Sequence, residues 1–121
     1  KLNKTLILGF PGNPVSTFVS SLIFLRPLID KYINTKKKLN IKNGNITKEL
    51  GKNDEREEYL RAKIYYDNNI YKVEPLIGQD SSMTSYLSKA DGLIIRKPFD
   101  KALKIGSNVS ILIFSDIHPH I

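Results

Sequence analysis

Three short segments of the chain carry residue types that suit a small oxyanion. In the first, Gly-Phe-Pro-Gly-Asn-Pro-Val-Ser, Asn13 and Pro14 are typical of the cap and first turn of a helix. Unpaired amides at a helix start attract phosphate and other oxyanions. Gly12 would let the backbone approach such a ligand, and Ser16 could add a hydroxyl. The simpler interpretation is a well-capped helix after a tight turn, and spacing alone does not decide. The candidates here are Pro11, Gly12, Asn13, Pro14 and Ser16.

The second segment, residues 54–62, ends in an alternating strand that carries Arg61. On this strand Arg61 faces away from Leu60 and Ala62, because successive side chains point to opposite faces. A guanidinium held on a rigid strand can grip a tetrahedral oxyanion with paired donors, where lysine offers only a point charge. The alternative is a solvated arginine paired with a glutamate from the Glu57-Glu58 pair.

The third segment, residues 78–85, leads into a short helical patch at 81–89. Ser81 stands at its start, where serine is most often only a cap. His118 and His120 have no third ligand near them in the sequence, so we expect no metal site within the chain.

The first third of the chain reads as a strand, a loop and a helix. An apolar run at 5–9 predicts a buried strand, and apolar residues from Val15 to about Tyr32 keep helical spacing. Pro27 lacks an amide hydrogen, so a kink is expected there. Such a unit is normally part of a parallel α/β sheet, whose strand ends usually bind ligands.

The rest of the chain changes character. Residues 34–45 are polar and basic and predict a linker. Strands are expected at 59–66, 70–76, 93–96 and 109–114, with a hairpin turn at 67–69 and Pro75 at an edge or bulge. Short strands with close turn signals favour a small β-barrel or sandwich. An α/β remnant and an all-β module therefore share one chain.

Composition limits the function classes. The formal net charge of +7 is spread along the 121 residues, with one cluster at 36–38, and tyrosines at 59, 65, 66 and 71 could stack on single-stranded nucleic acid. We favour solvated lysines and half-buried strand tyrosines, and expect no nucleic-acid partner. The absence of cysteine excludes disulfides and thiol catalysis, and fits a cytoplasmic protein. The longest apolar stretch, 18–29, is too short and interrupted to span a bilayer, so no membrane association is expected.

The three segments, in this order, resemble the C-terminal region of the MoeA and gephyrin E-domain family. Members typically read GLPGNPVS, an Arg-Pro, a linker, a strand with Gly-Arg-x-x-[Phe/Tyr]-x-Arg-[Ala/Gly], Gln-Gly-Ser, Ala-[Asn/Asp]-Gly and a closing Gly-x-x-Val strand. The matches here are Gly9 to Ser16, Arg26-Pro27, Arg56 with Tyr59, Arg61 and Ala62, Gln79 with Ser81, Ala90-Asp91-Gly92, and Gly106 with Val109. Asp80 replaces the glycine of Gln-Gly-Ser, a departure that bears on the geometry at Ser81.

The resemblance implies a domain plan and a reaction. Residues 1–34 would end a MogA-like molybdopterin-binding α/β domain, 35–45 would be a linker, and 46–121 would be a C-terminal β-barrel domain. The family inserts molybdate into adenylylated molybdopterin, releases AMP and leaves molybdenum on the dithiolene sulfurs. Members use a divalent metal, taken here as Mg²⁺, and act as homodimers. A molybdopterin adenylyltransferase-type partner is also expected.

Carried over by position, Pro11, Gly12, Asn13, Pro14 and Ser16 would line the cleft, and Arg61 and Ser81 would help to bind molybdate. The family's catalytic acids and lysines, which also serve the metal, precede the first motif, so a preceding segment is expected. This chain alone should be inactive. The alternative is a scaffold module of the gephyrin type, without catalysis in this part of the chain.

Overall fold

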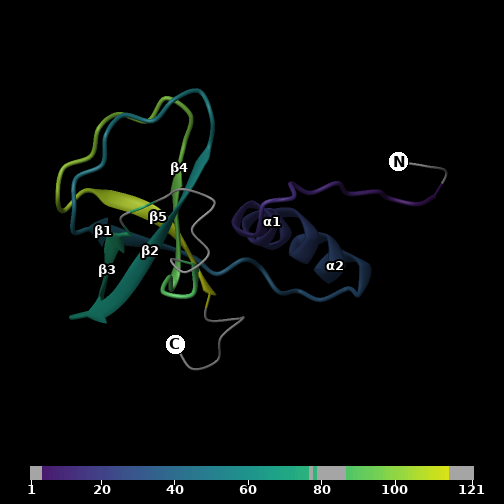
Figure 1. Cartoon of the computed structure of the whole chain (residues 1–121). Helices are drawn as coiled ribbons and strands as arrows, with labels where there is room; N and C mark the ends of the chain where they lie inside the picture. The colour runs from purple at the N-terminus through teal and green to yellow at the C-terminus, as the bar shows by residue number, and fades with distance from the viewer. Residues whose placement is uncertain (1–3, 77, 79–86, 115–121) are drawn as a thin grey trace. The chain divides into compact units, whose positions relative to one another are not determined.

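A computed structural model describes residues 4–76, 78 and 87–114. The chain divides into two compact units, one with the described residues up to Lys38 and the other with those from Leu39 onward. Figure 1 shows the helical first unit and the strands of the second. Each unit is described by itself.

The first unit is one helical run in three parts. It consists of α1 (Pro14–Ser20), a widened stretch η1 (Ser21–Leu25) and α2 (Arg26–Tyr32). In η1 the Arg26 amide donates to the Ser21 carbonyl five residues earlier. Pro27 follows directly and has no amide to donate, so the predicted irregularity takes the form of a wider turn. Among the described residues, no helix is both long and apolar enough to cross a membrane.

The strand expected at residues 5–9 is not formed. Thr5 makes one isolated β-bridge, the residues after it belong to no strand, and Leu6 and Ile7 are 42% and 63% exposed. A strand needs a neighbour for its backbone hydrogen bonds, and no named strand of the described residues pairs with this segment. The prediction of a buried strand here was therefore wrong for the structure described.

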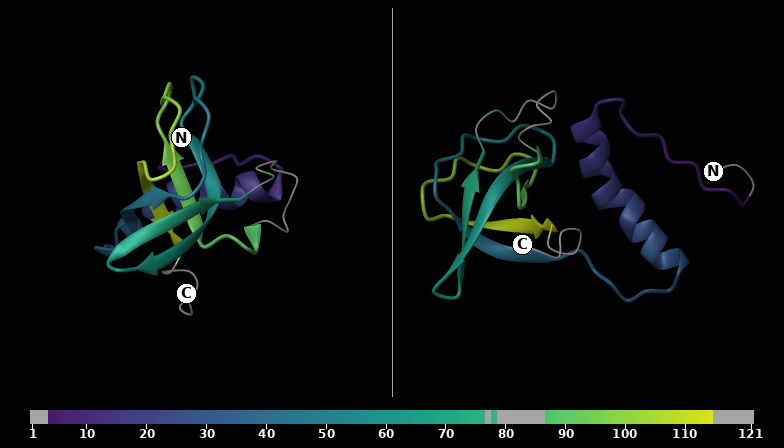
Figure 2. Two further views of the ribbon diagram at one scale, coloured as in Figure 1. Left: turned by 90° about the vertical axis from the view of Figure 1, so that its left-hand side faces the viewer. Right: turned by 60° about the horizontal axis from the view of Figure 1, so that its bottom comes forward.

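The second unit is a closed five-stranded barrel. Its strands are β1 (Ile41–Ile46), β2 (Glu58–Asp67), β3 (Ile70–Pro75), β4 (Gly92–Arg96) and β5 (Asn108–Ile113). They follow one another around the barrel in the order β1-β3-β2-β4-β5, and Figure 2 shows them from two further sides. Only the β1–β3 pair is parallel among the five pairings. The predicted small barrel is confirmed.

The inner face of the barrel is apolar and alternates as the sequence indicated. The buried cluster consists of Ile46, Leu60, Ala62, Val73, Ile94, Val109, Ile111 and Ile113. The β2–β3 hairpin turns at Asn68 and Asn69, which have φ of 49° and 62°. Asparagine tolerates this left-handed region better than most residues, which is why the turn was predictable.

Strand β1 begins at Ile41, inside the segment predicted to be a linker up to residue 45, so the strand starts earlier than expected. Its sequence, Ile-Lys-Asn-Gly-Asn-Ile, is mostly polar, and only Gly44 and Ile46 are buried. The strand forms because β5 and β3 offer it partners on both sides, from Ile41↔Leu112 to Ile46↔Val73. Local sequence preference does not report such long-range pairing.

Candidate substrate-binding site

The helix start expected to bind an anion is capped from within. The Asn13 side-chain oxygen accepts from the amides of Val15 and Ser16, at 3.0 and 3.2 Å. The Thr17 hydroxyl donates to the carbonyls of Asn13 and Pro11. These contacts match the simpler of the two interpretations of the sequence, a well-capped helix start. An oxyanion at the same amides would have to displace the Asn13 side chain, and that binding mode stays a prediction.

The other residues of this loop leave room for a ligand. Pro11, Gly12 and Pro14 are exposed, and Ser16 is half-buried. A Cβ added at Gly12 would meet nothing within 4 Å, and Gly12 is not among the glycines with positive φ. Neither crowding nor backbone conformation within the described residues requires glycine there.

Arg61 lies on the outer face of β2, as predicted, but it is not solvated. The residue is 2% exposed, whereas Lys63, the next outward residue of the strand, has a side chain that is 38% exposed. The Arg61 Nη2 atom donates to the Gly78 carbonyl at 2.9 Å. This contact is a hydrogen bond to a backbone carbonyl, whereas the alternative interpretation expected an ion pair with Glu57 or Glu58.

Arg61 has apolar neighbours on its face of the sheet. It stands opposite Leu93 of β4, and Leu93 stands opposite Leu112 of β5. Leu93 and Leu112 are 0% and 4% exposed and lie outside the inner core cluster. A charged donor in such surroundings makes a stronger hydrogen bond than one in water.

The remaining predicted site residue, Ser81, lies outside the described residues, as do Gln79 and Asp80 of the same motif. The helix start and Arg61 belong to different units.

The Tyr59 hydroxyl on β2 has a pKa well above the ordinary value of a phenol. Burial and, second, the Glu57 carboxylate, which accepts a hydrogen bond from the hydroxyl, together raise the pKa of Tyr59 to about 12. The phenol therefore stays protonated, and it serves as a donor, over the whole physiological range. It lies two residues before Arg61 on β2.

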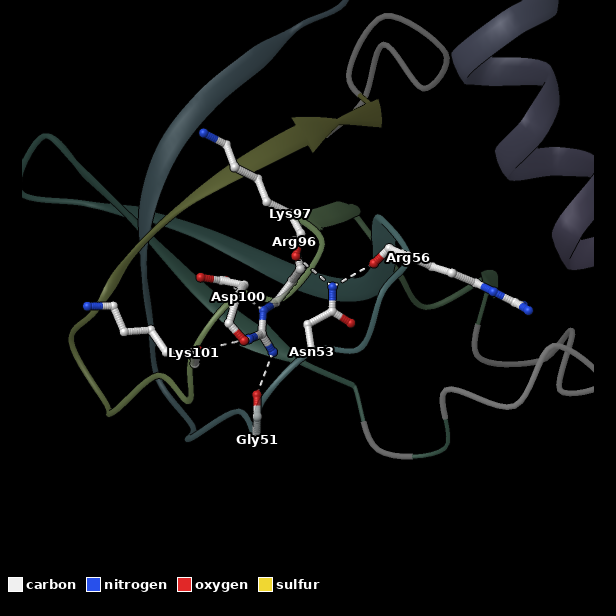
Figure 3. A network of polar contacts seen from close by, with 7 residues as sticks. All are labelled: Gly51, Asn53, Arg56, Arg96, Lys97, Asp100 and Lys101. Atoms are coloured by element: carbon white, nitrogen blue, oxygen red, sulfur yellow. Dashed lines mark hydrogen bonds and ion pairs between the residues drawn. The ribbon is translucent and has the colours of Figure 1, made fainter.

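Arg96 is a buried cation that sequence reasoning missed. It is 2% exposed and lies on the inward register of β4 with Gly92 and Ile94. Its guanidinium donates to the carbonyls of Gly51, Asp100 and Lys101 and to the Asp100 carboxylate at 3.0 Å. Figure 3 shows these contacts with a second set, in which the Asn53 amide bonds the carbonyls of Arg56 and Lys97. All of these donors bind acceptors of the chain itself, so the network holds the loop at residues 51–56 and the loop at residues 97–101 together.

Asp91, which the sequence analysis named only as part of a motif, is a second residue with several polar contacts. Its carboxylate accepts from the Ile64 amide at 3.1 Å and approaches the Lys63 ammonium at 3.4 Å. Its own amide donates to the Ala62 carbonyl, and its carbonyl accepts from Phe114. Asp91 therefore ties the start of β4 to the middle of β2 and to the end of β5.

No three acidic or histidine side chains gather in the described part of the chain to hold a metal ion. The expectation that Mg²⁺ binds elsewhere stays a prediction.

A family model describes most of the barrel. Residues 43–114, more than half of the 121-residue chain, match the model of the MoeA C-terminal region, domain IV. The chain belongs to the MoeA family. The resemblance read from the motifs is thereby confirmed.

Solved structures of this family share the fold. A molybdenum cofactor biosynthesis protein from Pyrococcus furiosus aligns with a TM-score of 0.72 and 18% identity, covering 84% of this chain and 36% of its own. A molybdopterin biosynthesis MoeA protein from Pyrococcus horikoshii OT3 aligns with 0.67 and 22%, covering 84% and 26%. This chain thus spans about a quarter to a third of the structures it matches. A search of the curated proteins finds no match.

Proposed function

We propose that this MoeA-family chain forms the C-terminal part of a molybdopterin molybdotransferase. The observation that carries the proposal is the match of residues 43–114 to the MoeA C-terminal region. In the proposed reaction, adenylylated molybdopterin and molybdate react, AMP leaves, and molybdenum remains on the dithiolene sulfurs. Residues 1–34 would then be the end of the molybdopterin-binding α/β domain.

The contribution of this chain would be to hold molybdate. A tetrahedral oxyanion needs several donors fixed in place, because donors that must reorganise during the reaction stabilise it less. The residues proposed to help bind molybdate are Ser16 at the start of α1, Arg61 on β2, and Ser81. Pro11, Gly12, Asn13 and Pro14 would shape the wall of the cleft. The accessible loop around Gly12 and the buried, charged donor at Arg61 support this assignment.

The same proposal includes the setting of the enzyme. We propose a cytoplasmic homodimer that uses Mg²⁺ and receives adenylylated molybdopterin from an adenylyltransferase-type partner. Metal-binding and proton-transfer residues would lie outside the described part of this chain. The chain alone is then expected to be inactive.

A complementation experiment tests the proposal. The full-length protein, expressed in a bacterial strain that lacks its own MoeA, is expected to restore a molybdenum-dependent enzyme activity. An Arg61→Ala variant should restore it only at raised molybdate, whereas Lys101→Ala, at an exposed loop position, should match the wild type. A wild-type protein that fails to restore activity at any molybdate concentration, although it is soluble and folded, contradicts the proposal.

A further inference from the structure

Strand β1 contains the one Asn-Gly pair of the sequence, Asn43 and Gly44. In such a pair the backbone nitrogen of the glycine can attack the side-chain amide of the asparagine, because the glycine has no side chain in the way. The attack closes a succinimide ring and expels ammonia. Water then opens the ring at either carbonyl and leaves aspartate or isoaspartate. The reaction needs no enzyme, and water is the only reagent that it consumes.

Gly44 cannot be exchanged for a residue that would make Asn43 less reactive, because β3 lies against it. A Cβ added at Gly44 would lie 2.5 Å from the Val73 Cγ2 atom and 3.0 Å from the Tyr71 carbonyl oxygen. A glycine in a strand often marks such a close approach of another backbone. Asn43 itself is exposed, so its side-chain amide is open to water. Packing therefore keeps a reactive pair of residues in the strand.

Pairing with β5 restrains the Gly44 nitrogen. The Ile46 amide donates to the Ser107 carbonyl, just before β5, at 3.0 Å. Every second amide of a strand points to the same neighbour, so the Gly44 amide also points to β5, where Val109 stands opposite it. To attack, this nitrogen has to lose its proton to solvent and turn toward the Asn43 side chain. Both steps require β1 to leave β5.

We propose that Asn43 is a deamidation site that the closed barrel protects and an opened barrel exposes. The isoaspartate product has one extra backbone atom before Gly44, because the chain then runs through the former side chain. Strand β1 pairs with β5 up to Asn45 and with β3 at Asn45 and Ile46. The extra atom moves Ile46, which is 1% exposed in the core, out of this register. A barrel that has opened and reacted is therefore permanently marked and does not close again.

The first experiment compares the rate of deamidation in the folded and in the unfolded chain. The chain is kept at mildly alkaline pH with or without guanidinium chloride, and trypsin then releases residues 43–48 for mass spectrometry. Conversion at Asn43 should be at least about tenfold faster in denaturant, because a paired strand is open in only a small fraction of molecules. Asn45, in the same peptide but followed by Ile46, is the internal control and should stay intact. Equal rates in the two conditions, or faster conversion at another asparagine of the unfolded chain, would overturn the proposal.

The second experiment loosens β1 without denaturant. Ile46→Ala removes the buried side chain that anchors β1 in the core, and should speed conversion at Asn43 by about tenfold or more. Ile41→Ala, at the 49% exposed start of the same strand, should leave the rate near that of the wild type. If Ile46→Ala does not fold, Ile46→Val replaces it, with a smaller acceleration expected. Equal rates in the Ile46 and Ile41 variants would contradict protection by the pairing of β1.

The third experiment follows the product. Chains that have reacted in denaturant are returned to native buffer, and isoaspartate in the 43–48 peptide is located by enzymatic methylation. Chains with isoaspartate should be absent from the folded fraction. Asn43→Asp, which has the new charge but a normal backbone, should fold with a Tm close to that of the wild type. Isoaspartate chains that regain the Tm of Asn43→Asp would show that the barrel tolerates the extra atom, against the proposal.

Discussion

Replacing Gly92 with alanine is expected to destabilise the barrel by about 3 kcal/mol, because the new methyl group has no space. An added Cβ would lie 2.3 Å from the Leu112 carbonyl oxygen, 2.6 Å from the Ile64 Cδ1 atom and 3.3 Å from the Ile113 Cα atom. Two of these atoms are backbone of β5, which pairs with β4 through Gly92↔Ile113. Relieving the contact with the Leu112 carbonyl requires β4 and β5 to move apart at this pair.

Thermal and urea unfolding followed by circular dichroism measure this effect. A loss of about 3 kcal/mol corresponds to a fall in Tm of roughly 12–24 °C for a domain of this size. Gly51→Ala is the matched control, since a Cβ at Gly51 meets nothing within 4 Å and Gly51 has no positive φ. The reasoning is refuted if Gly92→Ala folds with a Tm within about 2 °C of the wild type, or if Gly51→Ala is equally damaging.

Two further predictions concern polar groups of the barrel. Arg96→Met should lower the free energy of unfolding, measured in urea, by about 3 kcal/mol, because three carbonyls and the Asp100 carboxylate lose their buried donor. The exposed control Arg56→Met should stay near the wild type. Equal effects of the two substitutions would contradict the role of the network. The pKa of Tyr59, about 12 against an ordinary 10.0, predicts a stabilising contribution that is complete below pH 10 and lost between pH 10 and 12. The Tm of the wild type should therefore fall more steeply over that interval than the Tm of Tyr59→Phe, and parallel curves would contradict it.

The parts of the fold that could be predicted depend on residues close together in sequence. The inward alternation of Leu60, Ala62 and Ile64 and the turn at Asn68 and Asn69 are local patterns, and the structure has both. The cap at Asn13 was also predictable, because its acceptor serves amides two and three residues away.

The parts that could not be predicted depend on distant partners. The β1 strand looks like a linker until β3 and β5 pair with it. Arg96 is buried because Gly51, 45 residues earlier, offers it a carbonyl. Alternation placed Arg61 on the correct face of β2, but nothing local indicated that its guanidinium would be buried and donate to the Gly78 carbonyl. Burial of a charge is a tertiary property, and the sequence shows only the charge.

The most direct measurement of the central claim is release of AMP by the purified full-length protein. Adenylylated molybdopterin and Mg²⁺ are supplied, and molybdate is added or withheld. AMP is expected to appear in proportion to molybdenum bound to molybdopterin, and only when molybdate is present. AMP release that ignores molybdate, or molybdenum insertion without AMP, would contradict the assignment of this barrel to a molybdate-transferring enzyme.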